Sequence, residues 1–252
     1  MISTRTLGYN GLLGNQMFQY ATAFALSKFL NTEYVIPEEN TKIEQIVAGN
    51  KSRCFLYDVF PNLSVKTKPQ IEIHPTSVYS PSGFNFDINI LNQSDGVDLI
   101  GFFQSEKWFK PAEEEIRSEF RLEPILSDKK GFIHVRRGDY CTKSDYHPHS
   151  DMDYYERAMS IMDKTEWLVF SDDPKWCRET FLGSNFEIVD ADEVTSLRMM
   201  MGCDYAIIAN STFSWWGSWL GKCKTIAPKK WFGPSCAVDN WDDIYCENWL
   251  VL

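Results

Sequence analysis

Two adjacent arginines end an apolar run in the second half of the chain, in the segment Phe132-Ile133-His134-Val135-Arg136-Arg137-Gly138-Asp139-Tyr140. Arginine carries a rigid planar fork of N–H donors that matches pairs of phosphate oxygens. The formal net charge of the chain is -10, so these arginines stand in an acidic background. We expect Arg136 and Arg137 to hold a small anion at the carboxyl end of a strand, where open α/β sheets bind ligands. The alternative is a surface pair that neutralises nearby acids.

Polar residues also follow three other apolar runs. The runs and their polar ends are Trp167–Phe170 with Asp172 and Asp173, Phe186–Val189 with Asp190 and Asp192, and Tyr205–Ala209 with Asn210-Ser211-Thr212-Phe213-Ser214. Parallel strands would bring all these ends to one edge. Hydroxyls and free backbone N–H groups at a helix start bind phosphate oxygens, and carboxylates accept hydrogen bonds from ribose or a guanine edge. The pattern predicts a site for a nucleoside diphosphate.

Each of these residues also has a purely structural interpretation. Asp173 precedes Pro174, as an N-cap precedes the first residue of a helix. Ser211 and Thr212 are equally suited to capping. His134 lies inside an apolar strand, where a hydrogen-bonded core histidine is common. The prediction of a ligand site rests on the convergence of several polar groups.

A glycine-containing loop near the N-terminus, Tyr9-Asn10-Gly11-Leu12-Leu13-Gly14-Asn15-Gln16, is a second candidate region. Gly14 would let the backbone approach a ligand, and Asn15 and Gln16 offer side-chain amides. The loop matches neither the G-x-G-x-x-G fingerprint nor the G-x-x-x-x-G-K-[ST] loop. Dinucleotide-binding and P-loop NTPase functions are therefore disfavoured.

The elements that must position these residues are clearest in the second half. Strands are expected at Phe132–Val135, Trp167–Phe170, Phe186–Val189, Tyr205–Ala209 and Thr225–Ala227, and helices at Asp153–Met162, Lys175–Phe181, Glu193–Cys203 and Phe213–Leu220. Strand alternating with helix at this spacing predicts an α/β fold with a doubly wound parallel sheet.

The first half has a less regular pattern. We expect a weak strand at Ile2–Leu7, a helix at Asn15–Leu30, a strand at Leu99–Gln104 and an acidic helix at Ala112–Phe120. The stretch Pro37–Asp98 is rich in Pro, Asn and Ser and gives no clear helical pattern. A turn-rich segment at Pro124–Lys130 predicts a domain boundary.

The composition limits the class of protein. An acidic chain is unsuited to nucleic acid or an anionic membrane surface as its main partner. No apolar run is long enough for a transmembrane helix, and the N-terminus has no signal-peptide pattern. Seven scattered cysteines without a C-x-x-C pair predict reduced thiols rather than a zinc or redox motif. We therefore expect a cytoplasmic protein.

Several segments together resemble one known family. They are Gly14-Asn15-Gln16-Met17-Phe18-Gln19-Tyr20-Ala21, His134-Val135-Arg136-Arg137-Gly138-Asp139-Tyr140, Phe170-Ser171-Asp172-Asp173-Pro174 and Ile208-Ala209-Asn210-Ser211-Thr212-Phe213-Ser214-Trp215-Trp216-Gly217, with Gly101–Lys107 and Ala227–Phe232 in support. These motifs resemble those of the α-1,2-fucosyltransferases of glycosyltransferase family 11. The resemblance runs in order over nearly the whole chain.

The resemblance implies an inverting, metal-independent transfer of L-fucose from GDP-fucose to the 2-hydroxyl of a terminal β-galactose. It implies no cofactor, and a GT-B-like fold with two Rossmann-type domains: residues 1–125 on the acceptor side and residues 126–252 binding the GDP-sugar. The last helix would pack back on the first domain. The expected acceptor is a free or lipid-linked galactoside oligosaccharide. A bacterial enzyme is expected, compatible with peripheral membrane association.

The resemblance also implies roles for single residues. Arg136, with Arg137, would hold the diphosphate, and His134 would face the guanosine. Asn15 would reach toward the β-phosphate or the fucose. Asp139 is a candidate base, and an acid at this spacing is equally suited to orient Arg136. The remaining substrate-binding residues expected are Gly14, Gln16, Asp172, Asp173, Asn210, Ser211, Thr212, Phe213 and Ser214.

Three features depart from the family pattern. Leu12 stands where the family usually has a second glycine. The chain is short for the family, and the shortfall lies in Pro37–Asp98. Asp204 and Tyr205 replace a more basic stretch. The first two features bear on acceptor choice and on activity.

Two other functions fit parts of the sequence. The triplets Asp151-Met152-Asp153 and Asp190-Ala191-Asp192 have the D-x-D form of metal-dependent glycosyltransferases. Asp151 and Asp153 also suit the start of a helix. A nucleotide-sugar or glycan-binding protein without catalysis, with Leu12 as the lesion, is the other alternative.

Overall fold

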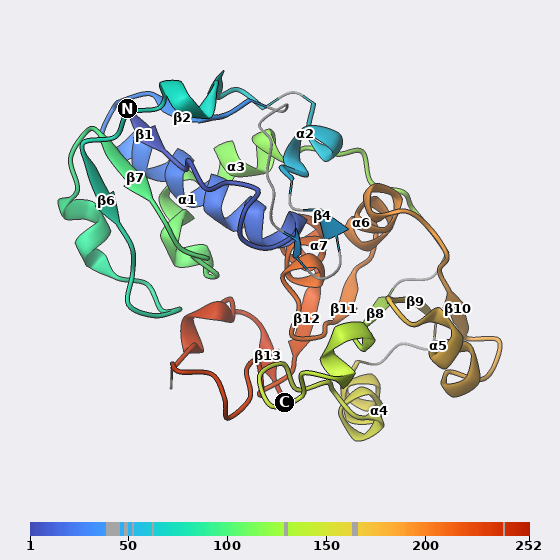
Figure 1. The fold of residues 1–252 in the computed structure, drawn as a ribbon. Helices are drawn as coiled ribbons and strands as arrows, with labels where there is room; N and C mark the ends of the chain where they lie inside the picture. The colour runs from blue at the N-terminus through green and yellow to red at the C-terminus, as the bar shows by residue number, and fades with distance from the viewer. Residues whose placement is uncertain are drawn as a thin grey trace. The chain divides into compact units, whose positions relative to one another are not determined.

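The computed structural model describes residues 1–38, 46–47, 50–51, 53–61, 63–128, 131–162, 166–238 and 240–252. The chain divides by its contacts into two compact units. The N-terminal unit comprises Met1–Arg121 and Asn240–Cys246, and the C-terminal unit comprises Leu122–Asp239 and Glu247–Leu252. Each unit contains a parallel sheet with helices (Figure 1). Two Rossmann-type sheets in one chain confirm the predicted GT-B-like α/β class.

The sheet of the C-terminal unit has the order β10-β9-β8-β11-β12-β13, and all its neighbouring strands are parallel. Its strands are β8 (Gly131–Val135), β9 (Trp167–Ser171), β10 (Phe186–Ile188), β11 (Tyr205–Ile207), β12 (Lys224–Ala227) and β13 (Leu250–Val251). The strand that comes first in the chain lies in the middle, so the order reverses between β8 and β11. Ligands of doubly wound folds bind at this switch point.

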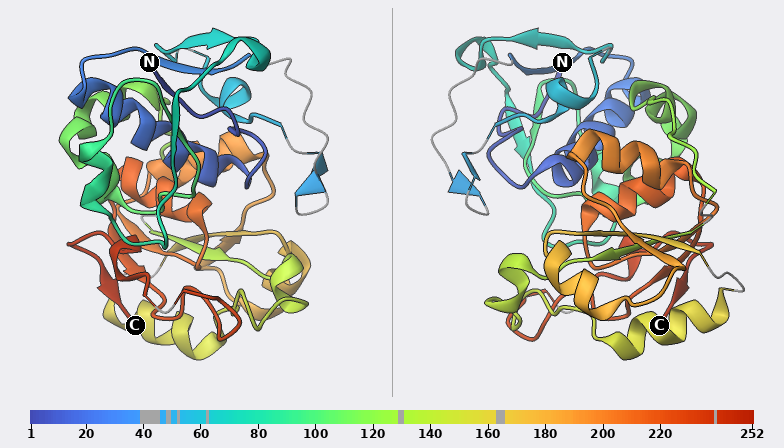
Figure 2. Two further views of the ribbon diagram at one scale, coloured as in Figure 1. Left: turned by 60° about the vertical axis from the view of Figure 1, so that its left-hand side comes forward. Right: turned by 90° about the vertical axis from the view of Figure 1, so that its right-hand side faces the viewer.

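Four helices cover the two faces of this sheet. They are α4 (Met152–Ile161), α5 (Pro174–Thr180), α6 (Glu193–Met201) and α7 (Thr212–Gly221). Figure 2 shows α4 and α5 on one face and α6 and α7 on the other. On the first face, Tyr155 and Ala158 of α4 pack with Ile133 and Val169 in a buried apolar core. The predicted strands and helices of this half are confirmed to within a few residues, but β13 was not predicted.

Side-chain caps explain where three of these helices begin. Asp151 accepts a hydrogen bond from the backbone N–H of Tyr154, and Asp192 accepts one from Thr195. Asp173 caps α5 in the same way, and Pro174 is the first helical residue, as predicted. Such caps satisfy backbone N–H groups that have no partner inside the helix.

The sheet of the N-terminal unit has the order β5-β2-β1-β7-β6, again entirely parallel. Its strands are β1 (Ile2–Ser3), β2 (Tyr34–Pro37), β5 (Lys66–Lys68), β6 (Ser77–Tyr79) and β7 (Val97–Leu99). The helices are α1 (Leu13–Phe29), the single turn α2 (Leu56–Val59) and α3 (Glu113–Glu119). β3 (Ile46–Val47) and β4 (Asn50–Lys51) pair with each other in antiparallel orientation.

Two predictions for the first half, and one for the C-terminal end of the chain, need correction. The strand expected at Leu99–Gln104 is β7, which ends at Leu99, so Gln104 lies in a loop. The strand expected at Ile2–Leu7 is limited to Ile2–Ser3 and continues as turns. The last helix is absent from the described residues, where Asn240–Cys246 holds only a 3₁₀ turn at Asp242–Ile244.

The change of unit after Arg121 lies close to the expected boundary. Assigning the acceptor to one unit and the GDP-sugar to the other stays a prediction. None of the helices in the described part of the chain is long and apolar enough to span a membrane.

Candidate functional site

The candidate site in the C-terminal unit lies at the carboxyl ends of β9, β8 and β11. His134 is paired in register with Phe170, and Val135 with Ser171. The residues after these strands are therefore level with each other, and Arg136 lies beside Asp172. On the other side of β8, β11 leads through Asn210 to α7. The switch point of the sheet thus brings together three of the four strand ends that the sequence analysis singled out. The fourth, β10 with Asp190 and Asp192, lies at the edge of the sheet beyond β9.

Arg136 is fixed by two carboxylates and an aromatic ring. Its Nη1 donates to Asp172, and its Nη2 donates to Asp139 Oδ1 at 2.7 Å. Its guanidinium carbon lies 5.0 Å from the centroid of the Tyr140 ring, a cation–π contact. These two bonds use two of the five guanidinium N–H donors. Arg136, with a side chain 22% exposed, keeps donors for a further acceptor.

Asp172 links both arginines at the strand end. Besides its bond to Arg136, its Oδ1 accepts from the backbone N–H of Arg137 at 2.9 Å. Gly138 makes room for this carboxylate, because a Cβ at that position would lie 2.4 Å from Asp172 Oδ2. The glycine of the Arg-Arg-Gly-Asp segment is thus explained by close packing against Asp172.

Arg137 faces α5. Its Nε donates to Asp173 Oδ2 at 3.3 Å, and its guanidinium carbon lies 4.2 Å from the centroid of the Trp176 ring. Asp173 uses its other oxygen to cap α5. Both Arg137 and Asp173 therefore have a structural function in anchoring this helix beside β8.

His134 links β8 to α7. Its Nδ1 lies 2.9 Å from Ser214 Oγ, and the same Oγ lies 3.2 Å from the carbonyl oxygen of Ser211. Both contacts are satisfied when Ser214 donates to Ser211 and the imidazole Nδ1–H donates to Ser214, which leaves Nε2 as an acceptor. Burial, together with the charge of Arg136, lowers the pKa of His134 to about 3. The imidazole is therefore neutral at physiological pH.

The first turn of α7 differs from the starts of the other three helices of this unit. Its N-cap residue, Ser211, makes no capping bond with its side chain. Within the described residues, the backbone N–H groups of Thr212, Phe213 and Ser214 have no hydrogen-bond partner. Three free N–H groups and the positive end of the helix dipole make this turn receptive to an anion. His134 contacts the same turn, with its ring 6.2 Å from that of Phe213.

Asn210 and Tyr140 form hydrogen bonds that hold the backbone in place just before α7. Asn210 is buried, and its Nδ2 donates to the carbonyl oxygens of Pro148 and Trp231. Tyr140 donates to the carbonyl oxygen of Asn210 at 3.1 Å. Asn210 therefore serves the structure of the loop, although its buried Oδ1 has no hydrogen-bond partner in the described part of the chain. Tyr140 was not among the predicted site residues.

The glycine-containing loop belongs to the N-terminal unit. Asn15 is half-buried, and its Oδ1 accepts from Gln104 Nε2 at 2.8 Å. Gln16 is fully buried, and both ends of its side chain are bonded to backbone groups of Gly11, Arg53 and Phe55. Gly14 is buried as well. The structure therefore uses Gln16 to hold the loop together, while Asn15 is half-buried and bonded through its Oδ1 to Gln104.

The two D-x-D triplets lie at helix starts and in ion pairs. Asp151 and Asp192 cap α4 and α6, Asp153 pairs with Arg157, and Asp190 pairs with Arg178. Among the described residues, no group of three or more His, Cys, Asp or Glu side chains has the geometry of a metal site.

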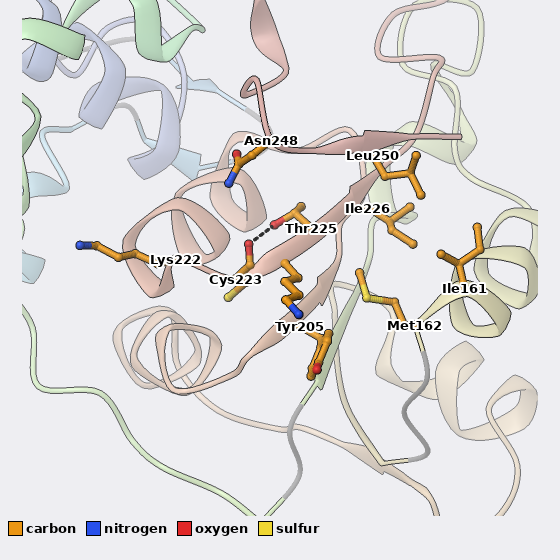
Figure 3. Close-up of a pocket in the computed structure, with 10 residues that line it drawn as sticks. Ile161, Met162, Tyr205, Lys222, Cys223, Thr225, Ile226, Asn248 and Leu250 are labelled. Atoms are coloured by element: carbon orange, nitrogen blue, oxygen red, sulfur yellow. Dashed lines mark hydrogen bonds between the residues drawn. The ribbon is translucent and has the colours of Figure 1, made fainter.

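A cavity of about 500 Å³ lies at the opposite end of the C-terminal sheet (Figure 3). It is lined by Tyr205 and Lys224, the first residues of β11 and β12. Figure 3 shows Ile161, Met162 and Leu250 on one side and Lys222 directed away from them. The polar residues of the candidate site lie at the carboxyl ends of the strands, so this cavity is separate from that site.

Residues 109–252 match the model of glycosyl transferase family 11. The chain belongs to this family. The predicted family resemblance is confirmed, and the protein is a glycosyltransferase.

Similar proteins are found in Escherichia coli and in Lagothrix lagotricha. The chain is 28% identical to the O-antigen biosynthesis glycosyltransferase WbnK of Escherichia coli, over 96% of this chain and 98% of the relative. It is 29% identical to an α-1,2-colitosyltransferase of Escherichia coli, over 88% and 90%. It is 24% identical to galactoside α-(1,2)-fucosyltransferase 1 of Lagothrix lagotricha, over 88% and 67%.

Two solved structures show a weaker likeness. A crystal structure of POFUT1 in complex with GDP has a TM-score of 0.44 and 13% identity, covering 90% of this chain and 97% of that one. A crystal structure of NodZ α-1,6-fucosyltransferase soaked with GDP-fucose has a TM-score of 0.39 and 11% identity, covering 87% and 90%. Neither likeness is close enough to bear on the site of this family 11 enzyme.

The sequence pattern missed some residues of the site in this family 11 enzyme. Tyr140 belongs to the Arg-Arg-Gly-Asp-Tyr segment, but its ring contact with Arg136 depends on the 3₁₀ turn Gly138–Cys141. Gln104 carries no local signal, because its partner Asn15 is 89 residues away in the chain. The segment Gly101–Lys107 belonged to the family resemblance, which was the one sign of its importance.

Proposed function

We propose that this enzyme transfers L-fucose from GDP-fucose to the 2-hydroxyl of a terminal galactose on a glycan, with inversion and without a metal ion. Family membership supports a glycosyl transfer. The α-1,2 linkage is supported by the names of two relatives, one a colitosyltransferase and one a galactoside fucosyltransferase. The acceptor is a galactoside-terminated oligosaccharide, free or lipid-linked.

The observation that carries the proposed donor site is the open first turn of α7 beside the strand end with Arg136. Three backbone N–H groups without partners in the described structure suit the oxygens of a diphosphate. Arg136 supplies positive charge from the neighbouring strand, and its two carboxylate bonds leave other N–H donors available. The hydroxyls of Ser211 and Thr212 lie at the same turn.

The guanosine is proposed to contact the neighbouring groups. His134 is neutral, and its Nε2 can accept a hydrogen bond from an N–H or O–H group of the nucleoside. The carboxylates of Asp172 and Asp173 accept hydrogen bonds from donors on the base or ribose. Asp172 already holds Arg136, so nucleoside binding would engage its remaining lone pairs.

The reaction breaks the bond between the fucose anomeric carbon and a β-phosphate oxygen, and forms a bond from that carbon to the acceptor 2-oxygen. The bonding pair of the broken bond leaves with GDP, so negative charge develops on the phosphate while the sugar gains oxocarbenium character. Arg136 and the first turn of α7 offset the developing charge with fixed donors, which is the largest contribution in many enzymes. In this way the proposed chemistry runs without a metal ion.

The acceptor hydroxyl must lose its proton as the new bond forms. Asp139 is held by Arg136 at 2.7 Å and lies 3.6 Å from Lys143 Nζ. A carboxylate in two ion pairs is better suited to orient the guanidinium than to take a proton. We therefore assign Asp139 to positioning Arg136, and a phosphate oxygen of the donor takes the proton.

The experiment that tests this function combines purified protein, GDP-fucose and a β-galactoside such as lactose in buffer with EDTA. We expect one trisaccharide per GDP released, with an α-fucosyl group on the galactose 2-oxygen identified by NMR. Product formation only after Mn²⁺ addition would support the D-x-D alternative. GDP binding without product for any β-galactoside would support the binding-protein alternative.

A second donor sugar is favoured by one comparison. A relative at 29% identity is named as a colitosyltransferase, and colitose is fucose without its 3-hydroxyl. A site that hydrogen-bonds a substrate hydroxyl rejects the analogue lacking it by a large factor. GDP-colitose in the same assay decides between the sugars: a higher kcat/KM than for GDP-fucose would identify colitose as the donor sugar.

A further inference from the structure

We propose that Gln104 is a positioning residue, which fixes the side-chain amide of Asn15 so that its NH₂ group faces the substrate. Asn15 then donates a hydrogen bond to an acceptor oxygen of the substrate, a phosphate or a sugar hydroxyl. This inference rests on the proposed transfer function, and it assigns a role to a residue that the site prediction did not contain.

The hydrogen bond between the two side chains defines which end of Asn15 is free. Gln104 Nε2 donates to Asn15 Oδ1 at 2.8 Å. Within the described structure, no partner is recorded for Asn15 Nδ2, and the residue is only half-buried. An asparagine with its oxygen occupied offers N–H donors to a ligand and no acceptor. Asn15 therefore suits an oxygen that is negatively charged or gaining charge.

Gln104 is buried, and its side-chain NH₂ group is bonded to Asn15. The residue is 6% exposed, and its Oε1 is buried without a hydrogen-bond partner among the described residues. A buried polar atom without a hydrogen bond destabilises the folded protein. Replacing Gln104 by an apolar residue would remove that destabilisation. The glutamine is thus explained by the bond it donates to Asn15.

The backbone next to each of these two residues has a conformation that allows their hydrogen bond. Gly11 has a φ of +82°, and a Cβ there would lie 2.2 Å from Asn15 Nδ2, so the loop leaves space for the amide. Phe103, next to Gln104, has a φ of 51°, which is costly for a residue other than glycine. This turn buries the Phe103 ring against Trp108, at 5.2 Å, and leaves Phe102 exposed. Strained backbone of this kind occurs at functional sites.

The pair also lies at the ligand-binding edge of its own sheet. The order β5-β2-β1-β7-β6 reverses between β1 and β7. Asn15 follows β1 through the glycine-containing loop, and Gln104 follows β7. Both therefore lie beyond the carboxyl ends of the two strands that flank the switch point of the N-terminal sheet.

The test uses variants that change the direction of the hydrogen bond. Gln104→Glu cannot donate to Asn15 Oδ1 and would accept from Nδ2, which turns the amide and presents the oxygen to the substrate. Gln104→Met removes the bond, and Asn15→Asp keeps the bond but loses the outward donor. Gln93→Glu is the matched control, because the Gln93 side chain donates to the backbone carbonyl of Asn89 in the same unit.

We expect Gln104→Glu and Asn15→Asp to lower kcat by about 100-fold, Gln104→Met to lower it less, and Gln93→Glu to leave it unchanged. An increased KM for GDP-fucose alone would identify a phosphate or donor-sugar oxygen, and an increased KM for the galactoside alone would identify an acceptor hydroxyl. In an Asn15→Ala background, Gln104→Glu should have no further effect. The same loss in both backgrounds would overturn the positioning role.

A second measurement does not depend on transfer. The side-chain NH₂ resonance of Asn15, assigned by its loss in Asn15→Ala, should shift in Gln104→Glu and Gln104→Met and stay in place in Gln93→Glu. An unshifted resonance in both Gln104 variants would overturn the inference. Absence of transfer by the wild-type protein, with the shifts present, would instead count against the proposed function alone.

Discussion

The imidazole Nδ1 of His134 lies 2.9 Å from the hydroxyl oxygen of Ser214. This bond joins the end of β8, where the two arginines follow, to the first turn of α7, whose backbone N–H groups are open. A change at either side chain would therefore alter both parts of the proposed diphosphate site. Because His134 is neutral at physiological pH, its imidazole adds no second positive charge beside the guanidinium group of Arg136.

The neutral state of His134 predicts a dependence of stability on pH. Its pKa is lowered from 6.5 to about 3, so between these values the unfolded chain binds the proton and the folded protein does not. Stability must fall as the pH is lowered through this window, by about 2 kcal/mol between pH 7 and pH 5. His134→Asn should remove this part of the slope in urea unfolding. Equal slopes for wild type and His134→Asn would refute the buried neutral histidine.

The open start of α7 predicts opposite effects of a new cap on stability and binding. Ser211→Asp supplies the missing side-chain cap and a negative charge near the helix dipole, which should raise the free energy of unfolding by about 0.5 to 2 kcal/mol. The same carboxylate would compete with a diphosphate, so affinity for GDP should fall tenfold or more. Ser211→Asn is the uncharged control and should weaken binding less. Unchanged GDP affinity in Ser211→Asp would show that the phosphates bind elsewhere.

The two roles considered for Asp139 predict different responses to substitution. As a positioning residue, it accepts a hydrogen bond from Arg136, which an asparagine oxygen can still accept. Asp139→Asn should then keep kcat within about tenfold of wild type, and Asp139→Ala should lose about 100-fold, with an unchanged pH profile. A general base would lose activity equally in both variants, and its titration would disappear from the pH–rate profile.

Leu12 occupies a position where glycine is not required by the backbone. It has a φ of -91° and a ψ of -169°, an extended conformation open to any residue. Leu12→Gly should cost about 0.5 to 1 kcal/mol of stability, because glycine gains freedom in the unfolded chain. Transfer activity should stay the same or rise. A collapse of activity in a folded Leu12→Gly protein would show that the leucine is an adapted part of the loop.

The sequence predicted the C-terminal unit well because its local signals agree with its fold. Apolar runs form buried parallel strands, and Asp173 with Pro174 marks a helix start that the structure contains. The prediction failed where tertiary contacts override local pattern. Asp98 reads as a loop residue, yet it lies fully buried in β7, where Ser3 and Arg5 hold its carboxylate. β5 is an edge strand of mainly exposed polar residues, which carry no apolar alternation.

For the candidate site, too, the sequence predicted one part and not the other. The polar strand ends were predicted to converge, because the carboxyl ends of parallel strands share one edge. Their individual partners could not be predicted. The contact between Arg137 and Trp176, for example, depends on how α5 packs beside β8. The bond between Asn15 and Gln104 depends on the neighbouring positions of β1 and β7 in the sheet.

Isothermal titration with GDP, ADP and UDP in EDTA tests the central claim most directly. The proposed site predicts selective binding of GDP by the wild-type protein and a large loss of affinity in Arg136→Ala. The matched control is Arg157→Ala, since Arg157 is an exposed arginine of the same unit paired with Asp153. In the transfer assay, Arg136→Ala should cost about 3 kcal/mol of transition-state stabilisation or more. Binding that needs Mn²⁺, or equal GDP affinity in wild type and Arg136→Ala, would contradict the account.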